Sequence, residues 1–179
     1  AVRVLGIDAS KKMIETAKTQ NQATQITYRI CGIEEYEYPQ ITWDCVISNL
    51  ALHYIANLGQ VFQNVHKTLK PDGVFIFNIE HPVFTAGVGQ DWIYNDKGEP
   101  IYWPIDHYFT PGQRKTNFLG CEVIKQHHTL TQILMGLLEH GFSIKAVEEA
   151  KPPAEMMHLP GMKDALRRPM MLLVKAVLS

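Results

Sequence analysis

Apolar and polar residues alternate along the chain in two distinct periods. Short apolar runs rich in β-branched and aromatic residues predict strands over 2–8, 26–30, 44–50, 74–80, 121–130, 142–150 and 169–178. Apolar residues that recur every three or four positions predict helices over about 11–18, 58–69 and 133–138. Ser10 and Asn57 are placed to cap the first two helices, "PDG" at 71–73 to end the second and turn the chain, and Gly141 to end the third.

The order of these elements predicts an α/β fold. Strands that alternate with helices favour a mostly parallel sheet covered by helices on both faces. At 179 residues, the chain has the size of a single domain. Ligands of such sheets bind beyond the carboxyl ends of the strands, so the informative positions are those that follow each strand. They are residues 8–9, 31–34, 48–53 and 80–81.

Residues 81–120 break this rhythm. The stretch holds several prolines and glycines, and its tryptophans and tyrosines are Trp92, Tyr94, Tyr102, Trp103 and Tyr108. Linkers do not carry so many large aromatics, which need burial or a ligand. We therefore predict that this stretch is a lid, inserted into the single domain 1–179, which covers a bound substrate. The same aromatics would equally anchor a long excursion to the core, or to a second subunit in a homodimer.

Composition narrows the classes of partner. Hydrophobic residues make up 46% and charged residues 20%, which is ordinary for a soluble globular protein. A net charge of −1 gives no general attraction to nucleic acid or to an anionic membrane. The run "LRRP" at Arg167 and Arg168 is too short to change this, and we expect a solvated loop. Three widely spaced cysteines are typical of reduced thiols in a cytoplasmic protein, and no apolar stretch is long enough to span a membrane.

Asp8 ends the first predicted strand, directly before a helix. A carboxylate there either interacts favourably with the helix dipole or accepts the two ribose hydroxyls of a nucleotide-like cofactor. From the pattern alone, both interpretations stay open.

The residues around Asp8 carry a family resemblance. "VLGIDASKKMIETAK" resembles the second-strand motif of class I S-adenosylmethionine-dependent methyltransferases, where a strand ends in Gly-x-Asp-x-Ser before a helix that begins with Met. "WDCVISNLALHYI" and "LKPDGVFIFNIEHPVF" resemble later motifs of that family in the same order, so the likeness covers roughly half the chain. It implies a Rossmann-like three-layer sandwich with an antiparallel last strand, S-adenosyl-L-methionine as cofactor, and methyl transfer.

The resemblance also assigns roles. Asp8 would accept the ribose hydroxyls, Met13 would pack on the adenine, and Ile33 would lie against it with its backbone N–H on a ring nitrogen. Asn49 and Leu50 would line the methionine end. The predicted cofactor-binding set is Asp8, Ala9, Met13, Ile33, Glu34, Asn49 and Leu50. Simple core packing would also explain Met13 and Ile33.

Two positions depart from the family pattern. Gly32 stands where the family often has an Asp for the adenine amino group; Glu34 would substitute, or is a surface acid. The family's first strand and Gly-rich loop would precede Val2. Gly87–Gly89 do not replace that loop, because they lie in the insertion and open no helix. We expect the missing unit to lie outside the printed sequence, since a sheet without it has two unpaired edges.

Two histidines follow predicted strands and are the candidate catalytic bases. His53 and His81 carry imidazoles of suitable pKa for taking a proton from an acceptor. His53 would equally be a helix-start residue bonded to backbone, and His81 an anchor for the lid; Tyr54 is a third candidate. His127 and His128 predict no metal site, because neighbours in a strand point to opposite faces and no carboxylates accompany them.

The acceptor is predicted to be a small molecule. "SNLA" lacks the Pro-Pro-aromatic sequence of adenine-specific DNA methyltransferases, and the chain is near neutral. One alternative is a dinucleotide-binding Rossmann oxidoreductase, because an acid after the second strand binds ribose there too. Another is a non-catalytic cofactor-binding domain. "LKPDG" and "SNLALHYI" favour the methyltransferase over the oxidoreductase.

Overall fold

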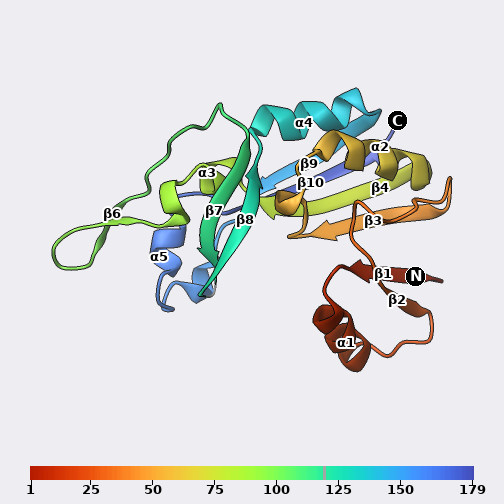
Figure 1. Ribbon diagram of the computed structural model, residues 1–179, viewed down its shortest axis with the longest axis horizontal. Coiled ribbons are helices and arrows are strands. Elements are labelled where there is room, and N and C mark those ends of the chain that lie inside the picture. The colour runs from red at the N-terminus through yellow and green to blue at the C-terminus, as the bar shows by residue number, and fades with distance from the viewer. Residues whose placement is uncertain (119) are drawn as a thin grey trace. The chain divides into compact units, whose positions relative to one another are not determined.

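The computed structural model describes residues 1–118 and 120–179; Leu119, which belongs to the predicted lid, lies outside the described residues. The described chain forms two compact units, 1–39 and 40–179 (Figure 1). Its fold is α/β and Rossmann-like, and the sheet is mixed and split. Within the described part, no helix combines the length and the apolar character that crossing a membrane requires.

The first unit is a strand–helix–strand motif. Strand β1 (Val4–Asp8) and strand β2 (Ile26–Ile30) pair in parallel, with Asp8 opposite Ile30, so both strands end at the same edge. Helix α1 (Lys11–Gln20) connects them and begins at Ser10, whose Oγ accepts a hydrogen bond from the Met13 N–H at 3.3 Å. The predicted N-cap is confirmed. The first unit therefore brings the residues after both strands to one place.

The second unit is built on a four-stranded sheet of order β3-β4-β10-β9. Strand β3 (Trp43–Asn49) runs parallel to strand β4 (Leu69–Glu80). Strand β10 (Met171–Leu178) is antiparallel both to β4 and to strand β9 (Phe142–Glu149). Three strands thus share a direction and only the last runs against them, which confirms the prediction for the last strand.

Two helices cover one face of this sheet (Figure 1). Helix α2 (Leu58–Thr68) and helix α4 (Leu130–Glu139) lie side by side there. Phe62 of α2 is completely buried, and its ring lies 6.3 Å from the ring of Phe75 and 6.2 Å from that of Phe77. Both β4 rings face the helices because alternate residues of a strand share a face. This aromatic contact is the centre of the core.

The opposite face of the same sheet is less covered. Ile47 of β3 remains 71% exposed, although it lies within a strand. Both α2 and α4 lie on the other face, so cover on both faces is not seen among the described residues of this unit.

The start of β4 differs from the sequence prediction. Asn57 caps α2 as expected, but β4 already begins at Leu69, and residues 71–73 fall within its bounds at a register shift between the pairs Trp43–Leu69 and Cys45–Val74. The chain is already extended at Leu69, which pairs with Trp43, and the Thr42 N–H donates to the carbonyl of the last helical residue. Pairing with β3 therefore begins directly at the end of the helix. Asp72 accommodates this with a positive φ of 60°.

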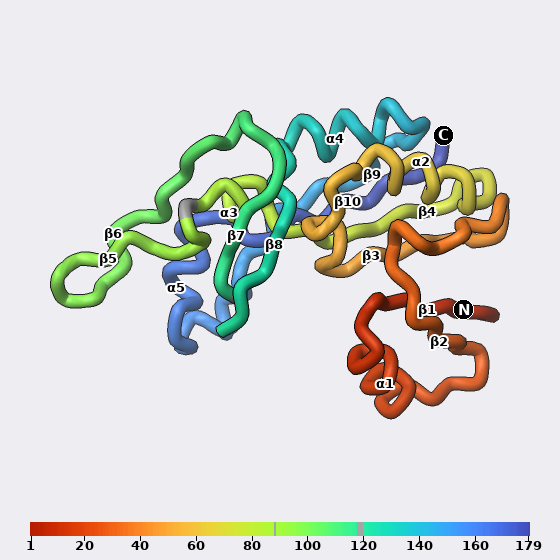
Figure 2. Tube along the Cα trace, in the orientation of Figure 1, coloured from red at the N-terminus to blue at the C-terminus, as the bar shows by residue number. Residues whose placement is uncertain are grey.

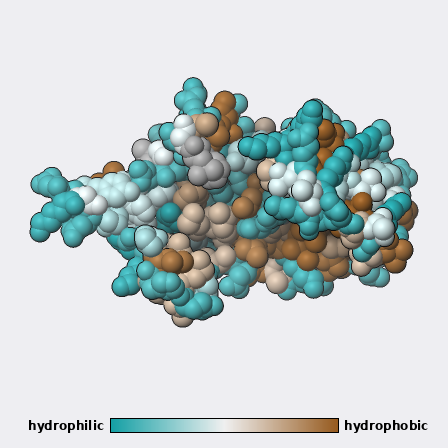
Figure 3. All heavy atoms as spheres, turned by 90° about the horizontal axis from the view of Figure 1, so that it is seen from below, coloured by the Kyte–Doolittle hydropathy of each residue, from teal (hydrophilic) through white to brown (hydrophobic). Residues whose placement is uncertain are grey.

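The insertion leaves the sheet at the end of β4 and returns to it only at α4 (Figure 2). Its elements are α3 (Pro82–Thr85), η2 (Val88–Gln90), β5 (Ile93–Tyr94), β6 (Pro100–Tyr102), β7 (Gly112–Phe118) and β8 (Cys121–His127). β5 pairs with β6 and β7 with β8, so the excursion contains two hairpins and extends past residue 120. The tip of the first hairpin, at the left of Figure 3, is hydrophilic. Short elements elsewhere are η1 (Leu52–Tyr54), η3 (Ala154–Met156) and α5 (Met162–Ala165).

Candidate functional site

Asp8 lies at the common end of β1 and β2. Its Oδ1 accepts a hydrogen bond from the Ser10 N–H at 2.7 Å, and its backbone carbonyl accepts one from the Cys31 N–H at 3.0 Å. The side chain is exposed, and Oδ2 receives no hydrogen bond from the described residues. One carboxylate oxygen therefore orders the turn into α1, and the other remains available to a ligand. Ala9, the next residue, is also exposed.

Met13 and Ile33 lie in the same unit. Met13 is 56% exposed, so core packing does not explain it. Ile33 is half-buried, and its carbonyl accepts a hydrogen bond from the Tyr38 hydroxyl at 3.0 Å. Burial of Tyr38 raises the pKa of its phenol to about 12, so this donor stays protonated at neutral pH. The Ile33 N–H finds no acceptor in the described chain.

The acid beside Ile33 that orders the loop is not the one expected. Glu35 accepts a hydrogen bond from the Gly32 N–H at 3.3 Å, whereas the side chain of Glu34 is exposed. Glu35 therefore shapes this loop, which leaves Glu34 free for either of its predicted roles.

Asn49 and Leu50 end β3 in the second unit. Asn49 lies opposite Asn78 of β4 and accepts a hydrogen bond from the Asn78 side-chain amide at 3.1 Å. The Leu50 N–H donates to the Asn78 carbonyl at 2.8 Å, and Leu50 has a φ of 52°, which is unusual for a residue that is not glycine. Backbone strain of this kind is found preferentially at functional sites.

His53 is buried beside the end of β4. Its Nδ1 accepts a hydrogen bond from the Glu80 N–H at 3.4 Å, and its Nε2 lies 3.9 Å from Glu80 Oε1. Burial lowers the pKa of His53 to about 4; nearby Lys125 acts in the same direction and Glu80 opposes it. At neutral pH the imidazole is therefore uncharged, and both of its nitrogens face groups of the protein.

Glu80 forms the centre of a buried polar network. Lys125 of β8 lies with its Nζ 2.5 Å from Glu80 Oε1, and the two side chains are only 2% and 7% exposed. Gln90 completes the network by donating to Glu80 Oε2 at 3.3 Å and accepting from Lys125 at 3.1 Å. The sequence analysis placed Glu80 among the informative positions at the strand ends but missed Gln90 and Lys125. No local signal marks Lys125, because its acid partner Glu80 lies 45 residues away in the sequence.

His81 joins two strand ends to the insertion. Its Nδ1 accepts a hydrogen bond from the Val83 N–H at 3.0 Å, which caps α3, and its Nε2 lies 3.0 Å from Glu149 Oε1 at the end of β9. Burial lowers the pKa of His81, and Glu149 opposes this shift. Tyr54, by contrast, is 44% exposed, and partial burial raises the pKa of its phenol.

The paired histidines serve the packing of the insertion. His127 Nδ1 lies 2.7 Å from Thr85 Oγ1, and its Nε2 lies 2.8 Å from the Tyr108 carbonyl. His128 Nε2 lies 2.8 Å from the Ile55 carbonyl. No group of three or more metal-binding side chains was found among the described residues.

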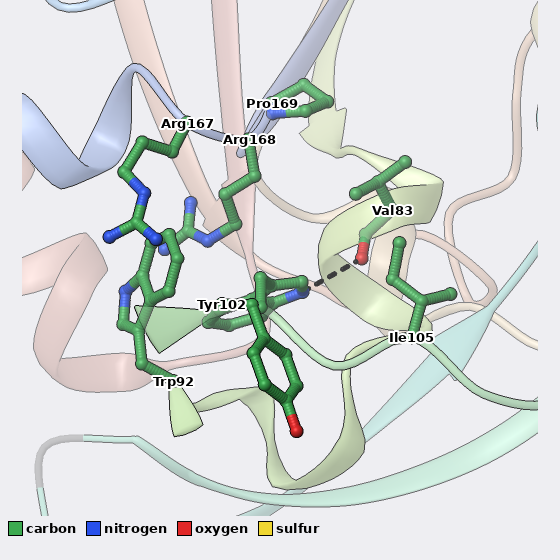
Figure 4. A pocket seen from close by; sticks show the side chains of 8 residues that line it. Val83, Trp92, Tyr102, Ile105, Arg167, Arg168 and Pro169 are labelled. Carbon is green, nitrogen blue, oxygen red and sulfur yellow. Dashed lines mark hydrogen bonds between the residues drawn. The ribbon is translucent and has the colours of Figure 1, made fainter. Parts of the chain in front are cut away.

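A cavity of about 240 Å³ opens within the insertion, beside the end of β4 (Figure 4). It is lined by Val83, Trp92, Tyr102, Trp103, Ile105, Arg167, Arg168 and Pro169. Trp103 forms one wall: it stacks on Phe84 with ring centroids 5.2 Å apart and donates from Nε1 to the Val83 carbonyl at 3.2 Å. This packing requires Gly87, because a Cβ there would lie 2.5 Å from Trp103 Cζ2.

Arg168 corrects the prediction of a solvated loop, whereas Arg167 is exposed as expected. Arg167 and Arg168 extend side by side toward Trp92 from the segment that leads into β10 (Figure 4). The Arg168 guanidinium carbon lies 4.2 Å from the Trp103 ring centroid and 4.7 Å from that of Phe84. Burial lowers the pKa of Arg168. The sequence analysis missed this site because "LRRP" carries no sign of the aromatic rings that face it.

Comparisons with known proteins place these features in context. A family model described as "Methyltransferase domain" matches residues 1–77. An uncharacterized protein of Haemophilus influenzae is 31% identical over 183 residues, which cover 98% of this chain and 72% of that protein.

Two solved structures are similar over almost the whole chain. A structure described as a putative S-adenosylmethionine dependent methyltransferase from Listeria monocytogenes is 42% identical, with a TM-score of 0.95 and coverage of 100% of this chain and 81% of that one. An S-adenosylmethionine dependent methyltransferase from Mesorhizobium loti is 38% identical, with a TM-score of 0.88 and coverage of 99% and 81%.

Proposed function

Because this chain belongs to the S-adenosylmethionine-dependent methyltransferases, we propose that it methylates a small-molecule acceptor bound at the insertion. The observation that carries this proposal is the aromatic cavity, which lies where β4 ends and β10 begins. Ligands of α/β sheets bind at such strand ends. A cavity of about 240 Å³ suits one ring-sized group.

The residues of the first unit fit the nucleoside part of the cofactor. Asp8 offers a carboxylate oxygen, Met13 an exposed apolar side chain and Ile33 an N–H without a protein acceptor. We assign these to the ribose hydroxyls, the adenine face and an adenine nitrogen, with Ala9 and Glu34 beside them. Asn49 and Leu50 are assigned to the methionine part. When bound, the cofactor supplies a methyl group on a sulfonium, ready for in-line displacement.

This chain's own residues would position the acceptor and exclude water, which is what methyl transfer chiefly requires. Trp92 and Trp103 are suited to holding a planar group. We propose that His53 and His81 contribute to catalysis by ordering the ends of the strands beside which they lie. In a base role, the acceptor would have to reach His53 Nε2, which lies 3.9 Å from Glu80 Oε1, or His81 Nε2, which lies 3.0 Å from Glu149 Oε1. A cytoplasmic location and a homodimer stay predictions.

Calorimetric titration of S-adenosylhomocysteine into the full natural chain tests the cofactor assignment. Asp8→Ala should weaken binding roughly tenfold to a hundredfold, because a hydrogen bond to a charged group contributes about 1.5–3 kcal/mol. Asp8→Asn separates the roles of the side chain, since it can keep the bond to Ser10 while losing the charge. Glu15→Ala, an exposed acid on α1, is the matched control and should bind like wild type.

Two results would contradict the assignment: no binding by the wild type, or equal binding by wild type and Asp8→Ala. If the cofactor binds, turnover with any small acceptor would exclude a non-catalytic domain. Methylation restricted to protein or nucleic acid would contradict the proposed acceptor class.

A further inference from the structure

Arg168 has buried donors that no described residue of the protein satisfies. Its Nε and Nη1 are shielded from solvent, and neither has a hydrogen-bond partner among the described residues. Its guanidinium instead contacts aromatic rings, with the centroids of Trp103, Phe84 and Trp92 at 4.2, 4.7 and 5.4 Å. Such contacts hold the plane of the group but do not replace its hydrogen bonds.

The neighbouring Arg167 is used differently. Its Nη1 donates to the Pro100 carbonyl at 2.8 Å and lies 3.0 Å from Asp164 Oδ1, and its Nη2 donates to the Ile101 carbonyl. Arg167 therefore fastens β6 to the segment before β10. Its bonds are internal, which leaves Arg168 as the cavity's uncommitted cation.

The charge of the cavity is unbalanced. Both guanidinium groups lie close to the Trp92 ring, at 4.5 Å for Arg167 and 5.4 Å for Arg168, and the lining contains no acidic residue. Two acids lie nearby: Asp164 pairs with Arg167 at 3.0 Å, and Glu149 lines an adjacent cavity that Arg168 also borders but lies against His81. Arginine stays protonated in proteins. A buried cation without a partner costs free energy, which an anion bound in the cavity would offset.

We propose that this cavity binds the carboxylate or phosphate group of a planar small molecule, with Arg168 as its ionic partner. The aromatic rings of Trp92 and Trp103 supply walls for the planar body, and guanidinium groups pair geometrically with both kinds of anion. The inference deepens the proposed function, on which it rests, because it gives the acceptor an anionic group. Arg168 would select the acceptor rather than take part in the methyl transfer.

Titration of simple aromatic probes tests the site without any cofactor. Benzoate and phenyl phosphate carry the two anions on one ring, and benzamide is the neutral isostere of benzoate. Binding is followed by tryptophan fluorescence, to which Trp92 and Trp103 report directly. At least one anionic probe should bind ten times or more tightly than benzamide, and Arg168→Met should abolish that preference while leaving benzamide binding unchanged.

Two further variants make the result specific. Lys163→Met removes the same charge from an exposed position on the same segment and should leave anion binding at the wild-type level. Arg168→Lys keeps the charge and should retain part of the preference, which shows that loss in Arg168→Met is not loss of fold. Equal binding of benzamide and both anions by wild type would overturn the proposal. So would undiminished anion binding by Arg168→Met.

The same proteins are titrated with S-adenosylhomocysteine. Wild type that binds the cofactor product but neither anionic probe would refute the anion site and leave the methyltransferase assignment intact. Wild type that binds a probe through Arg168 but not S-adenosylhomocysteine would refute the proposed cofactor assignment and retain the anion site.

Discussion

The free energy of unfolding should decrease steeply as the pH is lowered, because His53 is buried next to a charged pair. Burial lowers the pKa of His53 from 6.5 to about 4 in the folded state. Between these two values the unfolded chain binds a proton at this residue and the folded chain does not. Stability from His53 is therefore complete above pH 6.5 and decreases as the pH falls toward 4.

The size of the effect follows from the shift. Each pKa unit corresponds to about 1.4 kcal/mol, so His53 should account for about 3 kcal/mol of lost stability between pH 7 and pH 4. That is a large part of the 5–15 kcal/mol that typically separates folded from unfolded states. Protonation would also place a third charge beside the buried Glu80 and Lys125.

Urea unfolding from pH 7 to pH 4 measures this loss. Burial also lowers the pKa values of His81, His127 and His128, so wild type should lose more than the contribution of His53 alone. His53→Gln should lose about 3 kcal/mol less than wild type over the same range. His158→Gln, which changes an exposed histidine, should follow the wild-type curve. Parallel curves for His53→Gln and wild type would refute the reasoning.

Three single substitutions and one double variant test other parts of the structure by urea unfolding at neutral pH. Lys125→Met should cost about 3–5 kcal/mol, because it leaves the Glu80 carboxylate buried without its partner, and Lys125→Met combined with Glu80→Gln should recover part of that cost. Gly87→Ala should cost about 1–3 kcal/mol and alter near-ultraviolet circular dichroism, because the new methyl overlaps Trp103; an unchanged spectrum would contradict the close packing. Asn57→Ala should cost about 1 kcal/mol through loss of the bond to the Gln60 N–H, and a cost near zero would show that the cap is dispensable.

Features that depend on near neighbours in the sequence were the predictable ones. Ser10 and Asn57 cap their helices because a cap bonds to an N–H only three residues away. The strands were predictable for the same reason, because each is a run of apolar residues that are neighbours in the sequence. The start of β4 shows the limit of this logic: the apolar run begins at Val74, but pairing of Leu69 with Trp43 draws the chain into the strand earlier, with residues 71–73 at a register shift.

Asp8 was found because the family motif surrounds it, whereas Glu80 and Lys125 have no such local mark. The two are 45 residues apart, and their pairing exists only because β8 is brought to the end of β4. An isolated lysine in a strand is expected to be solvated, because burying its charge without a partner costs too much free energy. Its acid partner becomes visible only with the topology of the insertion.

Arg167 and Arg168 show why residue type and position in the sequence do not decide a role. They are adjacent and chemically identical, yet Arg167 bonds to two backbone carbonyls and Asp164, while Arg168 reaches aromatic rings and its Nε and Nη1 find no acceptor among the described residues. The difference is set by what the insertion places opposite each of them. A satisfied arginine of this kind stabilises a fold, and an unsatisfied one costs stability that only a ligand returns. Arg168 is therefore better explained by binding than by folding.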